Sequence, residues 1–195
     1  MTLSCRFQEA LTFAVELHDG QPRKGTSIPY ISHLLGVASL VLDNGGDEDE
    51  AIAALLHDAI EDQGGSETRE EIRRRFGDRV VEIVDGCSDT DSTPKPPWLE
   101  RKKAYLTHLR NASASVLLVS AADTLHNARA ILNDYRELGE PLWERFNGGR
   151  EGTLWYYRSV VTAFRKAAAA PLRLVEELDR IVSEIEGLAS SGKSN

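Results

Sequence analysis

Residues 53–62 read Ala53-Ala54-Leu55-Leu56-His57-Asp58-Ala59-Ile60-Glu61-Asp62, an apolar segment that ends in four polar side chains. At about 100° per residue on a helix, Glu61 lies nearly above His57 and Asp62 nearly above Asp58. The surrounding alanines and leucines predict that this arc faces the protein interior. Burying an imidazole and three carboxylates together is costly unless a cation lies between them. The segment therefore indicates a divalent metal site and a metal-dependent hydrolase.

The composition is that of a globular domain, with 195 residues, 41% hydrophobic and 28% charged. No stretch is long and apolar enough to cross a bilayer, and the N-terminus lacks the layout of a signal peptide, so we expect a cytoplasmic protein without a membrane partner. Cys5 and Cys87 are expected to be reduced thiols. The net charge of −8 argues against nucleic-acid binding but allows a small anionic ligand. Nothing in the sequence specifies an oligomeric state.

Helical periodicity recurs along the chain, with no run of alternating β-branched residues that would predict a sheet. We therefore predict an all-α fold with one domain over residues 1–188 and a disordered tail over 189–195. Asp47 is placed to cap the helix that carries the His57-Asp58 pair. That helix is predicted to continue without a break until the Gly64-Gly65 pair.

Two further helices carry candidate partners for this pair. His33 opens one predicted helix, and Asp123 lies midway along a long apolar helix, where a charge needs a specific reason. Each side chain alone has a structural explanation, as a cap, a surface group or a hydrogen-bonding partner. Together with His57 and Asp58 they form a mixed nitrogen and oxygen ligand set that suits manganese, iron or zinc better than calcium. His126, close to Asp123 on the same helix, is a rival ligand.

The order His, His-Asp, Asp on three helices resembles the HD superfamily of phosphohydrolases, and in particular the hydrolase domain of RelA/SpoT-type alarmone enzymes. The resemblance covers about residues 5 to 165 and rests on these segments: Arg23-Lys24-Gly25-Thr26, Pro29-Tyr30-Ile31-Ser32-His33, Leu55 to Asp62, Phe76-Gly77 with Val80 and Val84, and Ala122-Asp123-Thr124-Leu125-His126-Asn127-Ala128-Arg129. It implies an HD-domain helical bundle. Because the chain has no room for synthetase and regulatory domains, the expectation is a stand-alone small alarmone hydrolase.

The resemblance also implies a reaction, a cofactor and site residues. The reaction removes pyrophosphate from the 3′ position of guanosine tetra- or pentaphosphate (ppGpp or pppGpp) and leaves GDP or GTP. The implied metal is manganese, and its ligands are the residues that match the family's positions: His33, His57, Asp58 and Asp123. The positions of Glu61 and Asp62 lie at the reaction centre, where these carboxylates position water or transfer a proton.

Substrate contacts are expected from two regions. Arg23 and Lys24, on a glycine-containing loop, are suited to phosphate, with a solvated basic loop as the alternative. By resemblance, Asn127 contacts the ribose or the base. Tyr156 is a candidate for lining the nucleotide pocket, with a core position as the alternative. The basic run at 101–103 is interpreted as a solvated face.

Two positions depart from the long enzymes of this family. Ser120 stands where they tend to carry lysine, and Thr124 stands where they carry arginine or lysine. Both changes remove a cation and open the site to a less charged nucleotide, such as an adenosine alarmone or the 2′-phosphate of NADPH. A non-catalytic nucleotide sensor is a further alternative, against which the presence of Glu61 and Asp62 weighs.

Overall fold

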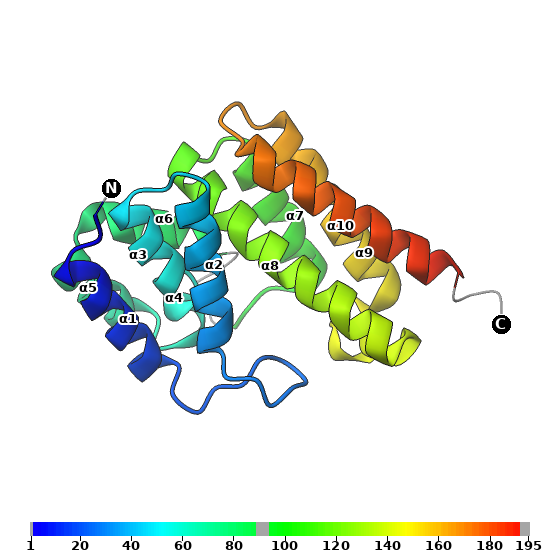
Figure 1. Ribbon diagram of the computed structural model, residues 1–195, viewed down its shortest axis with the longest axis horizontal. Helices are drawn as coiled ribbons and strands as arrows, with labels where there is room; N and C mark the ends of the chain where they lie inside the picture. The colour runs from blue at the N-terminus through cyan, green and yellow to red at the C-terminus, as the bar shows by residue number, and fades with distance from the viewer. Residues whose placement is uncertain (1, 89–93, 192–195) are drawn as a thin grey trace.

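The computed structural model describes residues 2–88 and 94–191, and in these ranges the chain forms ten α-helices, one 3₁₀ helix and no β-strand (Figure 1). In chain order they are α1 (Cys5–Leu17), α2 (Ile31–Asp43), α3 (Glu48–Leu56), α4 (Ala59–Asp62), α5 (Ser66–Phe76), α6 (Asp78–Cys87), α7 (Trp98–Leu109), α8 (Ala114–Leu138), η1 (Glu140–Arg145), α9 (Gly149–Lys166) and α10 (Leu172–Ser191). The predicted all-α, single-domain fold is confirmed.

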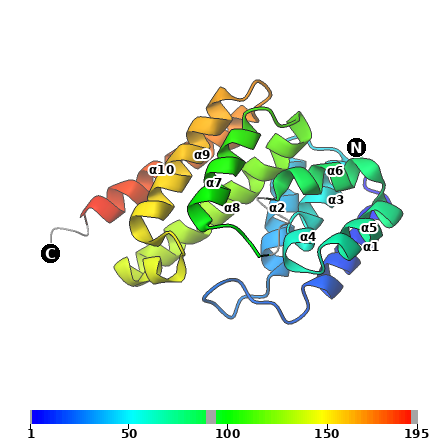
Figure 2. The ribbon, with the colours of Figure 1, turned by 180° about the vertical axis from the view of Figure 1, so that it is seen from behind.

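The long helix α8 joins two hydrophobic clusters. Its N-terminal half packs with α2, α3 and α6 in the main core, where Leu117 and Leu125 are fully buried. Its C-terminal half packs with η1 and α10 around Leu142 and Trp143. Figures 1 and 2 show α1 to α6 on one side of the molecule and α9 and α10 on the other, with α8 running between them. None of the helices in the described part of the chain has the length and apolar character that a bilayer crossing requires.

The helix α10 continues past the boundary expected at residue 188 and ends at Ser191. Its buried face repeats at helical spacing through Leu178, Val182, Ile185 and Ala189, so Ala189 belongs to the packed helix. The remaining four residues of the expected tail, 192–195, lie outside the described residues.

The predicted continuous helix through residues 53–62 is wrong, because the chain leaves the helix at His57 and Asp58. Asp47 caps α3 as predicted and forms a capping box with Glu50. The Nδ1 atom of His57 then bonds the carbonyl oxygen of Ala54 at 2.8 Å. A continuing helix would offer that carbonyl to the backbone N–H of Asp58. The helix therefore ends at Leu56 and restarts as α4, and the turn between them holds the His-Asp pair.

The loop between α1 and α2 folds back on itself and lies against the second half of the chain. Pro22 and Pro29 pair across it, and the Arg23 N–H donates to the carbonyl of Ile28 at 2.8 Å. Gly25 has a φ of +73°, and a Cβ there would meet Cδ of Arg145 at 2.6 Å. Glycine is thus required both by the backbone conformation and by the approach of Arg145. This packing places the loop against η1, and Arg23 of the same loop contacts His126 and Asn127 of α8.

Candidate metal centre and active-site pocket

Four predicted ligands from three parts of the fold meet at one point. His33 comes from α2, His57 and Asp58 from the turn between α3 and α4, and Asp123 from α8. The ligand atoms of His33, His57 and Asp58 all lie within 4.8 Å of one another. Nε2 of His57 lies 3.1 Å from Oδ2 of Asp58, and Nε2 of His33 lies 3.2 Å from Oδ1 of Asp123. Nε2 of His57 is also 3.5 Å from that Asp123 oxygen.

This donor set fits a divalent metal. Two imidazole nitrogens and two carboxylates, with no thiolate among them, suit a first-row divalent ion. Burial raises the pKa of the Asp58 carboxyl, but His57 beside it outweighs burial and lowers this pKa to about 2. Burial lowers the pKa of His57, but Asp58 and Asp123 outweigh it and raise this pKa well above its usual value. The carboxylates thus require positive charge at the imidazoles, which a proton or a divalent cation provides.

The surroundings of the cluster orient its members. The bond from Nδ1 of His57 to the Ala54 carbonyl turns the Nε2 atom of that ring toward Asp58. The hydroxyl of Tyr30 donates to Oδ2 of Asp58 at 2.5 Å. Burial, and then the Asp58 charge, raise the pKa of Tyr30, so the hydroxyl keeps its proton. Tyr30 belongs to a quoted motif but was not predicted as a site residue. Its position three residues before His33 is the sequence signal that it lies near the cluster.

Glu61 and Asp62 both line the pocket beside the cluster but have different neighbours. Oε1 of Glu61 pairs with Nζ of Lys95 at 2.8 Å and lies 3.9 Å from the guanidinium of Arg101. Asp62 accepts a hydrogen bond from Nε2 of Gln21 at 3.2 Å. Its side chain reaches solvent, yet the protein around it and then the Asp58 carboxylate raise the pKa of Asp62. The raised pKa makes Asp62 a candidate proton acceptor.

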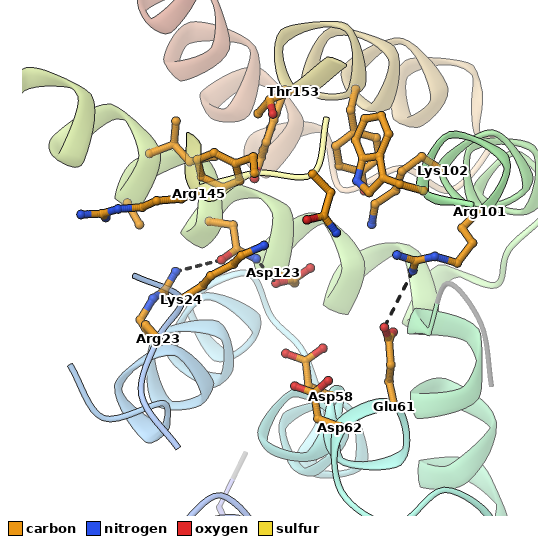
Figure 3. Close-up of a pocket in the computed structure, with 18 of the residues that line it drawn as sticks. Arg23, Lys24, Asp58, Glu61, Asp62, Arg101, Lys102, Asp123, Arg145 and Thr153 are labelled. Carbon is orange, nitrogen blue, oxygen red and sulfur yellow. Dashed lines mark hydrogen bonds and ion pairs between the residues drawn. The ribbon is translucent and has the colours of Figure 1, made fainter. Parts of the chain in front are cut away.

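A pocket of about 520 Å³ opens above the cluster, a volume that accommodates a nucleotide. Its cationic side chains come from the α1–α2 loop, from α7 and from η1. Figure 3 shows Arg101 of α7 pointing toward Glu61 of α4. The labelled residues include Arg23, Lys24, Arg101, Lys102, Arg145, Asp58, Glu61, Asp62 and Asp123. The interpretation of residues 101–103 as a solvated face is wrong for Arg101 and Lys102, because both line this pocket.

The predicted substrate-binding residues all line the pocket, and several of them already contact other side chains there. Asn127 donates through Nδ2 to Oδ1 of Asp123 at 2.7 Å and accepts through Oδ1 from Arg23 at 2.9 Å. Lys24 is exposed at the pocket edge. Tyr156 lies below the ammonium of Lys102, which is 4.8 Å from the ring centroid. Arg23 and Asn127 thus shape the site as well as line it.

The sequence profile of the HD domain family matches residues 10–154, a range that contains all four members of the cluster. The chain belongs to the HD-domain family. Its HD domain is 43% identical over 124 residues to guanosine-3′,5′-bis(diphosphate) 3′-pyrophosphohydrolase MESH1 of Xenopus tropicalis, and 37% identical over 124 residues to MESH1 of Homo sapiens. Each alignment covers 62% of this chain and 66% of the relative, slightly less than two thirds of the relative's length.

Longer bacterial proteins also match this chain. The HD domain is 33% identical over 132 residues to the bifunctional (p)ppGpp synthase/hydrolase SpoT of Escherichia coli K12, covering 65% of this chain and 18% of that protein. Among solved structures, one described as a metazoan ortholog of SpoT that hydrolyzes ppGpp has a TM-score of 0.77 at 28% identity, covering 96% of this chain and 99% of the other. The predicted resemblance to RelA/SpoT-type enzymes is confirmed.

Proposed function

We propose that this HD domain is a metal-dependent guanosine-3′,5′-bis(diphosphate) 3′-pyrophosphohydrolase, which converts ppGpp to GDP and pyrophosphate and pppGpp to GTP and pyrophosphate. The observation that carries the proposal is the cluster of His33, His57, Asp58 and Asp123 at the base of a cation-lined pocket of nucleotide size. The names of the MESH1 relatives support this substrate.

The proposed metal is Mn²⁺, held by the two imidazoles and the two carboxylates of the cluster. The absence of a thiolate from the cluster supports a metal that accepts nitrogen and oxygen ligands. When bound, such an ion neutralises phosphate oxygens and lowers the pKa of a nearby water. Because each ring presents Nε2 to the cluster, the imidazoles bind through that nitrogen.

The chain's own residues have separate roles in the proposed reaction. Water attacks the phosphorus bonded to O3′ of the nucleotide, the P–O3′ bond breaks, and O3′ leaves as a hydroxyl after taking up a proton. Asp62, whose pKa is raised by its surroundings, accepts the proton that the attacking water loses. Lys24 on one side of the pocket, and Arg101 and Lys102 on the other, bind the two diphosphate groups. Glu61, held by Lys95 and Arg101, keeps that cationic side in place.

The two departures from the long enzymes lie behind the pocket wall. Ser120 and Thr124 are buried, and neither lines the pocket. The hydroxyl of Thr124 donates to the carbonyl of Ser120 at 2.7 Å, and the hydroxyl of Ser120 lies 3.6 Å from Sγ of Cys87. The cations that line the pocket therefore come from other elements. This arrangement supports a substrate with two diphosphates over a less charged nucleotide.

Product analysis tests the proposal. Chelator-stripped protein is incubated with ppGpp, its adenosine analogue and NADPH, with and without Mn²⁺. We expect manganese-dependent release of pyrophosphate and GDP from ppGpp, its loss in Asp58→Asn, and its retention in the control His108→Gln, since His108 lies on α7 and contacts the carbonyl of Gly86. Orthophosphate released from NADPH alone would replace this function with the adenosine-nucleotide alternative. Tight binding of ppGpp without turnover would make the protein a sensor.

A further inference from the structure

The two ring nitrogens of His33 face different neighbours. Nε2 faces the cluster, 3.3 Å from Nε2 of His57, whereas Nδ1 lies 2.9 Å from Nδ1 of His126. Two neutral imidazole nitrogens at this distance share one proton, so one donates and the other accepts. A metal binds an unprotonated ring nitrogen, so His33 serves as a ligand through Nε2 only when its Nδ1 carries the proton.

Arg23 decides where that proton lies. One guanidinium nitrogen of Arg23 is 3.1 Å from Nδ1 of His126, and another donates to Oδ1 of Asn127 at 2.9 Å. A guanidinium has only donors, so a proton on Nδ1 of His126 would point at an N–H group. Nδ1 of His126 is therefore the acceptor for both neighbours. The shared proton therefore belongs to Nδ1 of His33. A metal then has to displace only the proton that Nε2 of this ring shares with Oδ1 of Asp123, 3.2 Å away.

Gly36 holds the other edge of the His126 ring. It lies in α2, one turn after His33, and a Cβ at this position would overlap Cδ2 and Nε2 of His126, far inside van der Waals contact. Glycine within a helix costs up to about 1 kcal/mol relative to alanine. The close approach of the His126 ring is the structural reason for a glycine here.

We infer that His126 is a positioning residue, clamped between Arg23 and Gly36, which fixes the His33 tautomer that binds metal. The inference rests on the proposed function only in that the cluster holds a metal. His57 obtains the same tautomer from a backbone carbonyl, so His33 is the imidazole whose ligand state depends on other side chains. His126 does not fit the rival role of metal ligand. Its Nδ1 atom contacts Nδ1 of His33, which is on the side of that ring facing away from the cluster. Arg23, predicted to bind substrate, acquires a second role.

Matched variants of His126 test the inference. His126→Gln keeps a side-chain acceptor for the His33 N–H, and His126→Leu removes it. Nitrogen-15 NMR of the metal-free protein reports whether Nδ1 of His33 carries a proton. Titration calorimetry with Mn²⁺ reports metal affinity. We expect the Nδ1–H form of His33 in the wild type, a metal affinity about 10- to 100-fold weaker in His126→Leu, and a smaller loss in His126→Gln.

Two further variants keep the test informative if His126→Leu does not fold. Arg23→Met removes the guanidinium from a loop outside the core, and Gly36→Ala displaces the ring while favouring the helix. Both are expected to weaken Mn²⁺ binding, whereas His108→Leu leaves it unchanged. The inference is overturned if Nδ1 of wild-type His33 carries no proton, or if Arg23→Met and Gly36→Ala both bind Mn²⁺ as the wild type does. If the His33 proton and the Mn²⁺ affinities are as expected but the protein does not hydrolyse ppGpp, the proposed function is wrong and this inference stands.

Discussion

At the scale of single residues, neighbouring carboxylates in the sequence have different electrostatic environments. Glu61 is tied to the cations Lys95 and Arg101, whereas Asp62 is held by the neutral amide of Gln21. A carboxylate beside cations keeps its charge and is a poor proton acceptor, while one near another carboxylate gains basicity. This difference is the reason that we propose Asp62, and not Glu61, as the group that accepts the proton.

Replacing Asp62 by asparagine tests this assignment. Asp62→Asn preserves the shape of the side chain and removes its basicity, so we expect kcat to fall about 10²- to 10⁴-fold while Mn²⁺ still binds. Steady-state kinetics and metal titration on the same sample measure both quantities. A variant with wild-type kcat would show that Asp62 does not take the proton.

The pKa of His57 predicts how metal affinity depends on pH. Because this pKa is raised well above its usual value, the ring of the metal-free protein is protonated at neutral pH, and a metal must displace that proton. Affinity should therefore fall as the pH is lowered, by up to about tenfold per pH unit for one displaced proton. Calorimetry in buffers of different ionisation enthalpy measures the released proton directly. Binding that is independent of pH and releases no proton would contradict the charge state described for His57.

At the scale of elements, sequence patterns predicted the helices and the metal ligands but not the contacts between distant segments. Helical spacing and the Asp47 cap depend on residues that are close in the sequence, so both could be predicted. The same local pattern predicted that α3 leads to the His-Asp pair. The break after Leu56 depends on a side-chain bond from His57 that competes with the helix. Likewise, the contacts of Tyr30 with Asp58 and of Arg101 with Glu61 join segments that periodicity cannot bring together.

The cap of α3 has a measurable contribution. Asp47 accepts from the backbone N–H of Glu50 at 3.0 Å, and its carboxylate also pairs with Arg79. Asp47→Ala removes the cap, so we expect the free energy of unfolding to fall by about 1 kcal/mol. Urea denaturation measures the change, with Glu82→Ala on the exposed face of α6 as the control. An equal effect in both variants would mean that the cap itself contributes nothing.

At the scale of the whole molecule, the cluster joins three separate parts of the main core. His33 lies on α2, the His57-Asp58 pair follows α3, and Asp123 lies on α8, so the proposed cation would hold these parts together. The sequence predicted this meeting from the ligand types together with the family resemblance, because no local pattern describes how α2, α3 and α8 pack.

Metal binding should therefore stabilise the whole domain. With free Mn²⁺ at about 100 times its Kd, we expect a gain of about 2.7 kcal/mol in the free energy of unfolding. Thermal melts of chelated and Mn²⁺-loaded protein measure the corresponding rise in Tm. His57→Ala should abolish the rise, and His108→Gln should preserve it. A Tm that does not respond to Mn²⁺ would argue against a metal in this cluster.

The membership of α8 in both hydrophobic clusters has a consequence for synthesis on the ribosome. Domains fold progressively as the chain emerges, N-terminal segments first. A nascent chain that has emerged as far as α4 already contains His33, His57 and Asp58, but the fourth donor, Asp123, is still to be translated. The α2–α3 surface against which α8 packs is exposed until then. Completion of the metal cluster and closure of the main core therefore await the same helix, and a chain that ends before α8 lacks the fourth donor of the site.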